Sequence, residues 1–268
     1  MTMQQPDTES NTAPSKGTPF ERPYFLHYYD CDWQRRHSIF SMLRFFEDIA
    51  MHQSEGRGIG LDYYEQQGVA WMLTQYDVSI HHAATLCSTV MVRTRPLAFR
   101  GMLATRSFAI YDEQDRCCVE AMSHWVFMDT RRRRPQRIPR EMFNGYGIDR
   151  ESADLVLPPA LPLVTEAMDE REFTVRLSDI DLNGHVNNIH YVEWALEALP
   201  ERLRREGMLK ELLVQFRRET HYGGNVTVRG SWKEQGDTLE ALHSIAAGDQ
   251  DLCRVRTRWS LPADALSS

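Results

Sequence analysis

Residues 179–194 of this chain are rich in polar side chains that could carry out acid–base chemistry. Asp181, Asn183 and His185 alternate there, and Asn187 and Asn188 follow. A carboxylate or an imidazole can move a proton near neutral pH, and amides can orient a reacting molecule by hydrogen bonding. The chemistry that this set indicates is acyl transfer, in which water or a nucleophile is activated and an oxyanion is stabilised.

An apolar helix is predicted directly after these residues. Its buried face consists of residues that recur at steps of three and four, and a proline ends it. These residues are Ile189, Val192, Leu196, Leu199 and Pro200. The polar groups therefore gather at the positive end of the helix dipole, where free backbone N–H groups can stabilise an oxyanion, keep a carboxylate ionised and favour neutral imidazole.

Each polar residue also has an ordinary structural explanation. Asp181 and Asn183 are of the types that cap a helix. The asparagines at 187 and 188 are common turn residues, and His185 could be a surface histidine with satisfied hydrogen bonds. The combination, and not any one residue, supports a site.

The same residues resemble a signature of the acyl-acyl-carrier-protein (acyl-ACP) thioesterases. The signature is Asp-Leu-Asn-Gly-His-Val-Asn-Asn at 181–188, followed by Tyr191, Trp194, Glu197 and Pro200. The segment Phe216-Arg-Arg-Glu-Thr220 resembles a second family segment, in which the last residue is often Cys. Thr220 therefore argues against a thiolate nucleophile at that position. The order and length of the two halves, over roughly residues 20–260, resemble the family as well.

The resemblance implies that the protein hydrolyses the thioester of acyl-ACP, releases a free fatty acid and ends fatty acid synthesis without a cofactor. It assigns Asp181, Asn183, His185 and Glu219 to the site. One carboxylate would activate water or attack the carbonyl while His185 and Asn183 orient it, and which carboxylate does which stays open. Because Glu219 is distant from Asp181 in the sequence, an ion pair with Arg217 or Arg218 is its structural alternative.

A weak internal repeat organises the chain. The first copy has a strand-like segment at 24–29 and a helix with Ile39, Leu43, Phe46 and Ala50 on one face; the second has residues 173–177 and the helix ending near Leu199. Further strands are predicted at 71–80, 89–94, 104–111, 119–129, 212–219, 225–232, 238–246 and 252–260. One helix wrapped by an antiparallel sheet, twice, is an α+β plan.

The resemblance names this plan a tandem (double) hot dog fold, with the two sheets side by side. We expect a disordered tail over 1–18, an N-terminal hot dog domain over 19–140, a proline-containing connection over 141–168 and a C-terminal domain over 169–268. Counting along the repeat places Asp32, Gln34 and Arg36 where the second copy has its polar set. The second domain is therefore predicted to be catalytic, and Asp32 to form a helix cap or a salt bridge.

The first half is predicted to hold the substrate pocket. Phe45, Phe46, Trp71 and Met72 could line an apolar pocket, although such residues are usually core. Docking of an acidic carrier protein would need basic surface, for which the sequence offers two groups. These are Arg131–Arg134 with Arg137 and Arg140, and Arg202, Arg204, Arg205 and Lys210.

Composition restricts the other partners. A net charge of −7 argues against nucleic acid. Five cysteines without a Cys-x-x-Cys pair indicate a reducing cytoplasm and no metal site. No run approaches the ~18 apolar residues of a membrane span, and the polar tail over 1–18 lacks the features of a signal or transit peptide. Dimerisation through sheet edges fits the fold.

Two other functions share these features. The first is a thioesterase for coenzyme A thioesters, or a hot dog hydratase, which would use similar Asp and His residues with different docking. The second is a noncatalytic acyl-binding protein on the same fold. The presence of all four site residues argues against the second, because binding alone does not need them.

Overall fold

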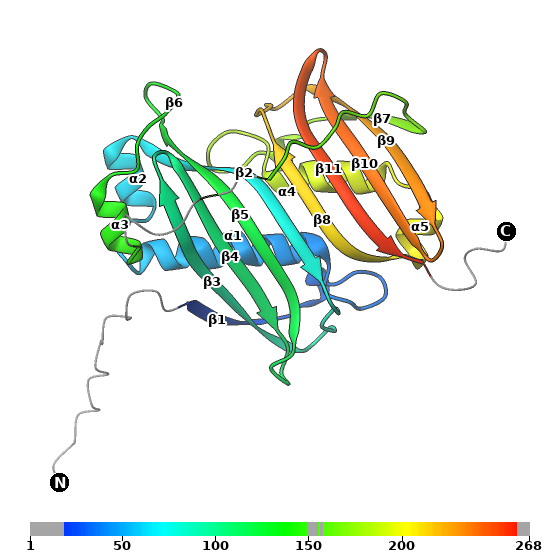
Figure 1. The fold of residues 1–268 in the computed structure, drawn as a ribbon, viewed down its shortest axis with the longest axis horizontal. Coiled ribbons are helices and arrows are strands. Elements are labelled where there is room, and N and C mark those ends of the chain that lie inside the picture. Colours follow the sequence, from blue (N-terminus) through cyan, green and yellow to red (C-terminus); the bar gives the residue numbers. More distant parts are fainter. Residues whose placement is uncertain (1–18, 149–154, 156–157, 262–268) are drawn as a thin grey trace, which may run out of the picture.

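One antiparallel sheet forms the centre of the molecule in the computed structural model, which describes residues 19–148, 155 and 158–261 (Figure 1). The strand order in this part of the chain is β1-β3-β4-β5-β2-β8-β11-β10-β9-β7, with β6 paired to β5. The strands of the first half are β1 (Phe20–Phe25), β2 (Val69–Ile80), β3 (Thr89–Arg100), β4 (Leu103–Tyr111), β5 (Cys117–Asp129) and β6 (Arg134–Pro135). Those of the second half are β7 (Asp169–Thr174), β8 (Met208–Phe216), β9 (Asn225–Gln235), β10 (Thr238–Ala247) and β11 (Gln250–Ser260).

The two halves join through β2 and β8. These strands pair antiparallel from Gln75 opposite Gln215 to Ser79 opposite Glu211. The predicted side-by-side arrangement of two helix-and-sheet units is therefore confirmed. Residues 158–168 cross the opposite face of the second half from its helix (Figure 1), where the Leu161 N–H donates to Gln215 Oε1 at 2.8 Å.

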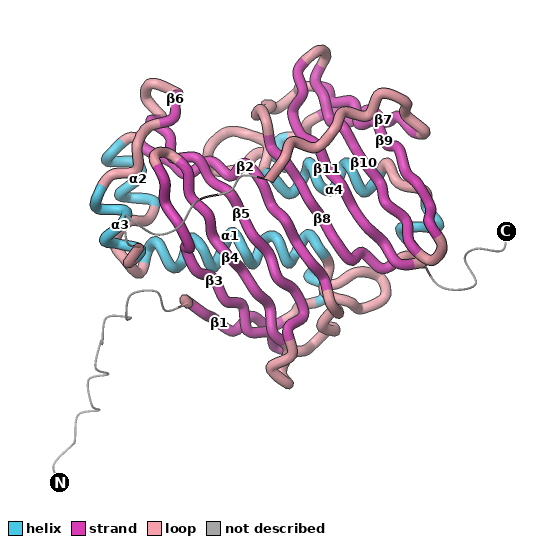
Figure 2. Tube along the Cα trace, in the orientation of Figure 1, coloured by secondary structure: helices cyan, strands magenta, loops and turns pink. Residues whose placement is uncertain are grey.

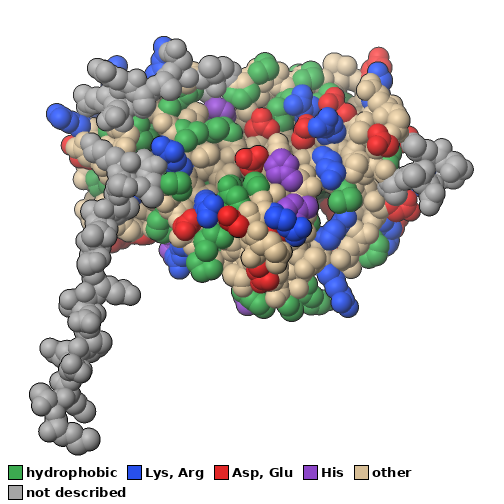
Figure 3. All heavy atoms as spheres, turned by 60° about the horizontal axis from the view of Figure 1, so that its bottom comes forward, with side chains coloured by type: hydrophobic (Ala, Val, Ile, Leu, Met, Phe, Trp, Pro, Cys, Tyr) green, Lys and Arg blue, Asp and Glu red, His purple; other side chains and the backbone are tan. Residues whose placement is uncertain are grey.

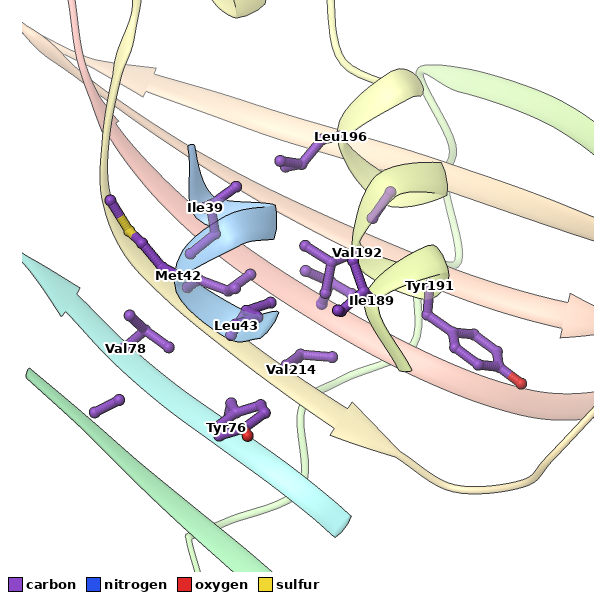
Figure 4. Close-up of a cluster of buried hydrophobic side chains, with 14 of the residues drawn as sticks. Ile39, Met42, Leu43, Tyr76, Val78, Ile189, Tyr191, Val192, Leu196 and Val214 are labelled. Carbon is purple, nitrogen blue, oxygen red and sulfur yellow. The ribbon is translucent and has the colours of Figure 1, made fainter. Parts of the chain in front are cut away.

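The two long helices lie on the same face of the sheet (Figures 1 and 2). They are α1 (Ile39–Glu55) and α4 (Asn188–Glu197), and short helices flank them: α2 (Leu61–Gln67), α3 (Arg140–Tyr146) and α5 (Glu201–Glu206). Apolar side chains at three- and four-residue steps on α1 and α4 bury against the sheet and each other. Figure 4 shows Leu43 of α1 near Ile189 and Val192 of α4, over Val214 of β8. The core is thus continuous between the halves.

The start of α4 differs from the expected one. Asp181 and Asn183 do not cap this helix; the cap is Asn187, whose Oδ1 accepts from the Ile189 N–H at 2.9 Å. All three are cap-type residues, so the sequence alone does not separate them. The helix ends at Glu197, before the predicted stop at Pro200.

Two predicted strands are displaced for a shared reason. Residues 24–29 and 173–177 were expected to be extended, but β1 and β7 end at Phe25 and Thr174. Each is followed by a 3-10 turn, Tyr28–Asp30 or Leu177–Asp179. The buried Asp30 and Asp179 side chains accept backbone N–H groups three residues earlier, at 2.9 and 2.8 Å. A buried aspartate that bonds its own backbone favours a turn over a strand.

The predicted domain limits stay predictions. The predicted tail, residues 1–18, lies outside the described residues, as do 149–154 and 156–157 of the expected connection. Within that connection, α3 packs with residues of the first half in a second apolar cluster that includes Met142, Phe143 and Phe127. Among the described residues, no helix is long and apolar enough to cross a membrane.

Two buried histidines should make stability depend on pH. His37 and His243 are 3% and 1% exposed, and neither ring has a hydrogen-bond partner among the described residues. Burial lowers the pKa of each to about 4. Between these pKa values and the ordinary histidine pKa, the unfolded chain binds more protons than the folded one. The contribution of each histidine to folding stability is therefore complete above about pH 6.5 and is lost as pH falls toward 4.

We expect each histidine to lower the free energy of unfolding by roughly 2–3 kcal/mol as the pH falls from 7 to 4.5. Glu47, whose pKa burial raises to about 7, acts in the opposite direction over the same window. The measurement is therefore urea unfolding of the wild type and of His243→Leu across this range. A difference between the two proteins that stays constant with pH would contradict the account.

Candidate active site

The Asp181 carboxylate is folded back onto its own turn. Its Oδ1 accepts the backbone N–H groups of Asn183 and His185, at 2.8 and 3.3 Å. The Asp181 N–H donates to the His185 carbonyl at 2.8 Å, and Gly184 takes a positive φ of 78° that an L side chain rarely adopts. These bonds fix Oδ1. Oδ2 has a long contact, 3.4 Å, with the Asn183 side chain and can still accept from a water or a substrate.

The first copy of the repeat makes the same turn with different chemistry. Asp32 Oδ1 accepts the N–H groups of Gln34 and Arg36, each at 2.9 Å. The second carboxylate oxygen pairs with the Arg36 guanidinium at 2.8 Å. The predicted salt bridge of Asp32 is confirmed. Because arginine stands where the second copy has His185, this carboxylate is neutralised, and Asp181 alone of the two turn aspartates keeps an oxygen without a cationic partner in the described chain.

Glu219 reaches the turn from the end of β8. Its Oε2 lies 3.2 Å from His185 Nε2, so residues from two distant segments meet. A backbone hydrogen bond from the Val186 N–H to the Thr220 carbonyl, 3.1 Å long, ties the two segments together. Of the two neighbouring arginines in the structural alternative, Arg217 pairs with Asp251 at 2.7 Å, and among the described residues the ion-pair partners of Glu219 are Arg133 and His185.

Two further residues at Glu219 were not predicted as site residues. Arg133, in the turn between β5 and β6 of the first half, forms an ion pair with Glu219 Oε1. The ring centroids of His221 and His185 are 5.1 Å apart. His221 could have been suspected, since it follows Glu219 by two residues in a polar segment. Nothing in the sequence connects Arg133 to this glutamate.

The His185, Glu219 and His221 ligand atoms lie close enough to share a metal ion. Two imidazoles and a carboxylate are a donor set that Zn²⁺ accepts. A cation here would have to share Glu219 with the Arg133 guanidinium. Two other such groups lie away from this turn, at His81, Cys117 and Glu120 and at His82, Asp112 and Cys118.

Asp181 also lines a cavity of about 540 Å³, whose lining does not include His185 or Glu219. Helix α1 lines one wall of it, and the turn with the start of α4 lines the other. The lining residues are Arg44, Glu47, Asp48, Met51, Ser178, Asp179, Ile180, Asp181, Asn187, Ile189 and His190. Both halves of the chain therefore build this cavity.

Glu47 is the unusual member of this lining. Burial raises its pKa to about 7, and the negative charge of Asp181 adds to the rise. A hydrogen bond from the Asn187 side chain and the Arg44 charge act in the opposite sense. No pattern in the sequence distinguishes Glu47 from the other acidic residues of the amphipathic helix α1.

The residues predicted to line a first-half pocket do not lie around this cavity. Phe46 is fully buried and stacks on Phe108 with ring centroids 4.7 Å apart, and Phe45 stacks on Tyr24 at 4.5 Å. Trp71 packs edge-on to Phe127, whereas Met72 is exposed. An acyl pocket in the first half stays a prediction.

Most of the chain is similar to known proteins. Residues 17–146 match the family model described as the acyl-ACP thioesterase N-terminal domain, and residues 164–261 match that of the C-terminal domain. A chloroplastic dodecanoyl-[acyl-carrier-protein] hydrolase from Cinnamomum camphora is 25% identical over 260 residues, which are 91% of this chain and 68% of that protein.

Two solved structures share the fold over nearly the whole chain. A Lactobacillus plantarum protein assigned as an oleoyl thioesterase superposes with a TM-score of 0.87 at 26% identity, over 92% of this chain and 98% of its own. The 12:0-ACP thioesterase from Umbellularia californica superposes with a TM-score of 0.80 at 21% identity, over 91% and 94%. The tandem hot dog fold expected from the sequence is thereby confirmed.

Proposed function

Because this chain belongs to the acyl-ACP thioesterase family, we propose that it hydrolyses the thioester that joins a fatty acyl chain to acyl carrier protein and releases the free fatty acid. The observation that carries the proposal is the contact between His185 and Glu219 beside the Asp181 turn. A carboxylate with a free oxygen, an imidazole and a second carboxylate are the groups that activate water for attack on a carbonyl.

In the proposed mechanism, Asp181 Oδ2 takes a proton from the attacking water. Glu219, whose Oε2 lies 3.2 Å from His185 Nε2, favours the tautomer of this ring that carries its proton on Nε2. Asn183 and the first turn of α4 hold the oxyanion that forms as water adds to the thioester carbonyl. Arg133 holds Glu219 from the other side, which brings a first-half residue into the arrangement.

The acyl carrier protein is proposed to dock on the arginines next to this site. Of the two basic groups in the sequence, the second is largely neutralised, since Arg204 and Arg205 pair with Glu197 and Glu201 at 2.7 Å each. In the first group, Arg131 bonds the Gln66 carbonyl, while Arg132 pairs with Asp129 and Arg133 with Glu219. The remaining exposed arginines, which pair with no carboxylate of the described chain, are Arg134, Arg137 and Arg140.

The positive charge that attracts the carrier protein has to come from a small group of residues in this protein. Acidic and basic side chains are interspersed on the face that Figure 3 shows, and the net charge is −7. An acidic partner would therefore be attracted by a small arginine group and not by the whole molecule. A cytoplasmic location is proposed on the five free cysteines, and a homodimer remains an expectation.

The test compares thiol release from long-chain acyl-ACP with release from the matching acyl-coenzyme A at equal concentration. We expect faster release from the carrier substrate, and a rate that falls with added salt for this substrate only. The double variant Arg134→Glu/Arg137→Glu should raise KM for acyl-ACP about tenfold and leave the coenzyme A thioester unaffected. Equal rates from both substrates would favour the coenzyme A alternative, and no release from either would favour a hydratase or a binding protein.

A further inference from the structure

Glu47 stands where the two halves of the chain share one cavity. It belongs to α1 of the first half, yet the facing wall comes from the second half and includes Asp181 and Asn187. The Asn187 Oδ1 is already used to cap α4, which leaves the amide N–H₂ of the same side chain as the donor toward Glu47. Asn187 therefore caps α4 and also lies beside Glu47 in the lining of the cavity.

The surroundings keep Glu47 protonated to a higher pH than an ordinary glutamate. From α1 it faces Arg44 and Asp48, and from the turn it faces Asp179 and Asp181. On α4, His190 pairs with Glu193 at 2.7 Å. On β2, the buried Tyr76 hydroxyl interacts electrostatically with Glu47. Arg44, which favours the charged form, is shared with Glu193 at 3.4 Å. The result is a carboxyl group with a pKa of about 7 beside a carboxylate.

Two neighbouring carboxyl groups with different proton affinities can divide acid and base roles between them. We propose that Glu47 is the general acid of the thioester hydrolysis and donates its proton to the sulfur atom that leaves. This proposal rests on the proposed function and adds a catalytic residue from the first half of the chain.

Hydrolysis of the thioester proceeds with atoms and charge conserved. Water gives a proton to Asp181, and its oxygen forms a bond to the carbonyl carbon. The carbon–sulfur bond then breaks with its electron pair going to sulfur, and the Glu47 proton adds to that sulfur to give the free thiol. The proton on Asp181 returns to Glu47 through the cavity, so the net reaction is thioester plus water to carboxylic acid plus thiol. An acid with a pKa near 7 is matched to an alkyl thiol, whose pKa is about 8.5.

The test uses leaving groups that differ in their need for a proton. Wild type and Glu47→Gln are assayed on an alkyl thioester, acyl-coenzyme A, and on a thiophenyl ester of the same acyl chain, whose thiolate leaves without protonation. We expect kcat to fall about 30-fold for the alkyl thioester and less than about threefold for the aryl thioester. Glu240→Gln, which removes an exposed charge on β10, is the control and should change neither.

The wild type supplies a second readout that does not depend on the variant folding. Its kcat for the alkyl thioester should decline on the alkaline side with an apparent pKa near 7, as Glu47 loses its proton, and this decline should be absent for the aryl thioester. Equal losses of Glu47→Gln on both substrates, or one pH profile for both, would overturn the general-acid role. A wild type that hydrolyses neither of these substrates nor acyl-ACP would overturn the proposed function itself.

Discussion

Asp181→Asn should lower kcat for acyl-ACP by at least about 1,000-fold while leaving the protein folded. The asparagine side-chain oxygen can still accept the Asn183 and His185 N–H groups that Asp181 Oδ1 accepts, so the turn is kept. What disappears is the negative charge on the oxygen that takes the proton from water. The measurement is steady-state thiol release together with the thermal unfolding temperature.

The chain contains its own matched control for this substitution. Asp32 makes the same turn in the first copy and accepts the corresponding two backbone N–H groups. Asp32→Asn removes one carboxylate charge from an equivalent turn and should change kcat by less than about twofold. Wild-type turnover in Asp181→Asn, or equal losses in the two variants, would contradict the role of Asp181.

Glu219→Gln should lower kcat by about 100-fold with little change in KM. The amide has the shape of the carboxylate, but it can also donate a hydrogen bond, so it no longer fixes which ring nitrogen of His185, 3.2 Å away, carries the proton. It also leaves the Arg133 guanidinium without its anionic partner. The measurement is steady-state thiol release from acyl-ACP, which gives kcat and KM separately.

Glu211→Gln is the control for this second substitution. Glu211 lies on the same strand, β8, and also pairs with an arginine, Arg258, but away from the turn. Its loss should leave kcat within about twofold of the wild type. A decrease below about tenfold in Glu219→Gln, roughly 1.4 kcal/mol in barrier, would reduce Glu219 to an accessory role.

The elements that could be predicted are those with a local signal. The apolar spacing of Ile39, Leu43 and Phe46 and of Ile189 and Val192 is visible in the sequence and fixes the buried faces of α1 and α4. Most strands lie within a few residues of their predicted limits for the same reason. The ends of β1 and β7 were misplaced because they depend on whether an aspartate is buried, which spacing does not show.

The residues of the candidate site also differ in whether a local pattern in the sequence shows them. Asp181, Asn183 and His185 lie in one short turn, and Glu219 was assigned to them by resemblance and not by spacing. Arg133 and Glu47 come from the first half, and their relation to the turn exists only after β2 pairs with β8 and α1 packs beside α4. The raised pKa of Glu47 depends on burial by residues from both halves, so no local pattern carries it.

The most direct test of the account is a single turnover of acyl-ACP in ¹⁸O-labelled water, with the released fatty acid analysed by mass. If Asp181 activates water for direct attack, the acid from the first turnover carries one solvent oxygen. Unlabelled acid in that turnover, with label appearing only later, would mean that a protein carboxylate attacks the carbonyl, and would contradict the proposed role of Asp181 as a base.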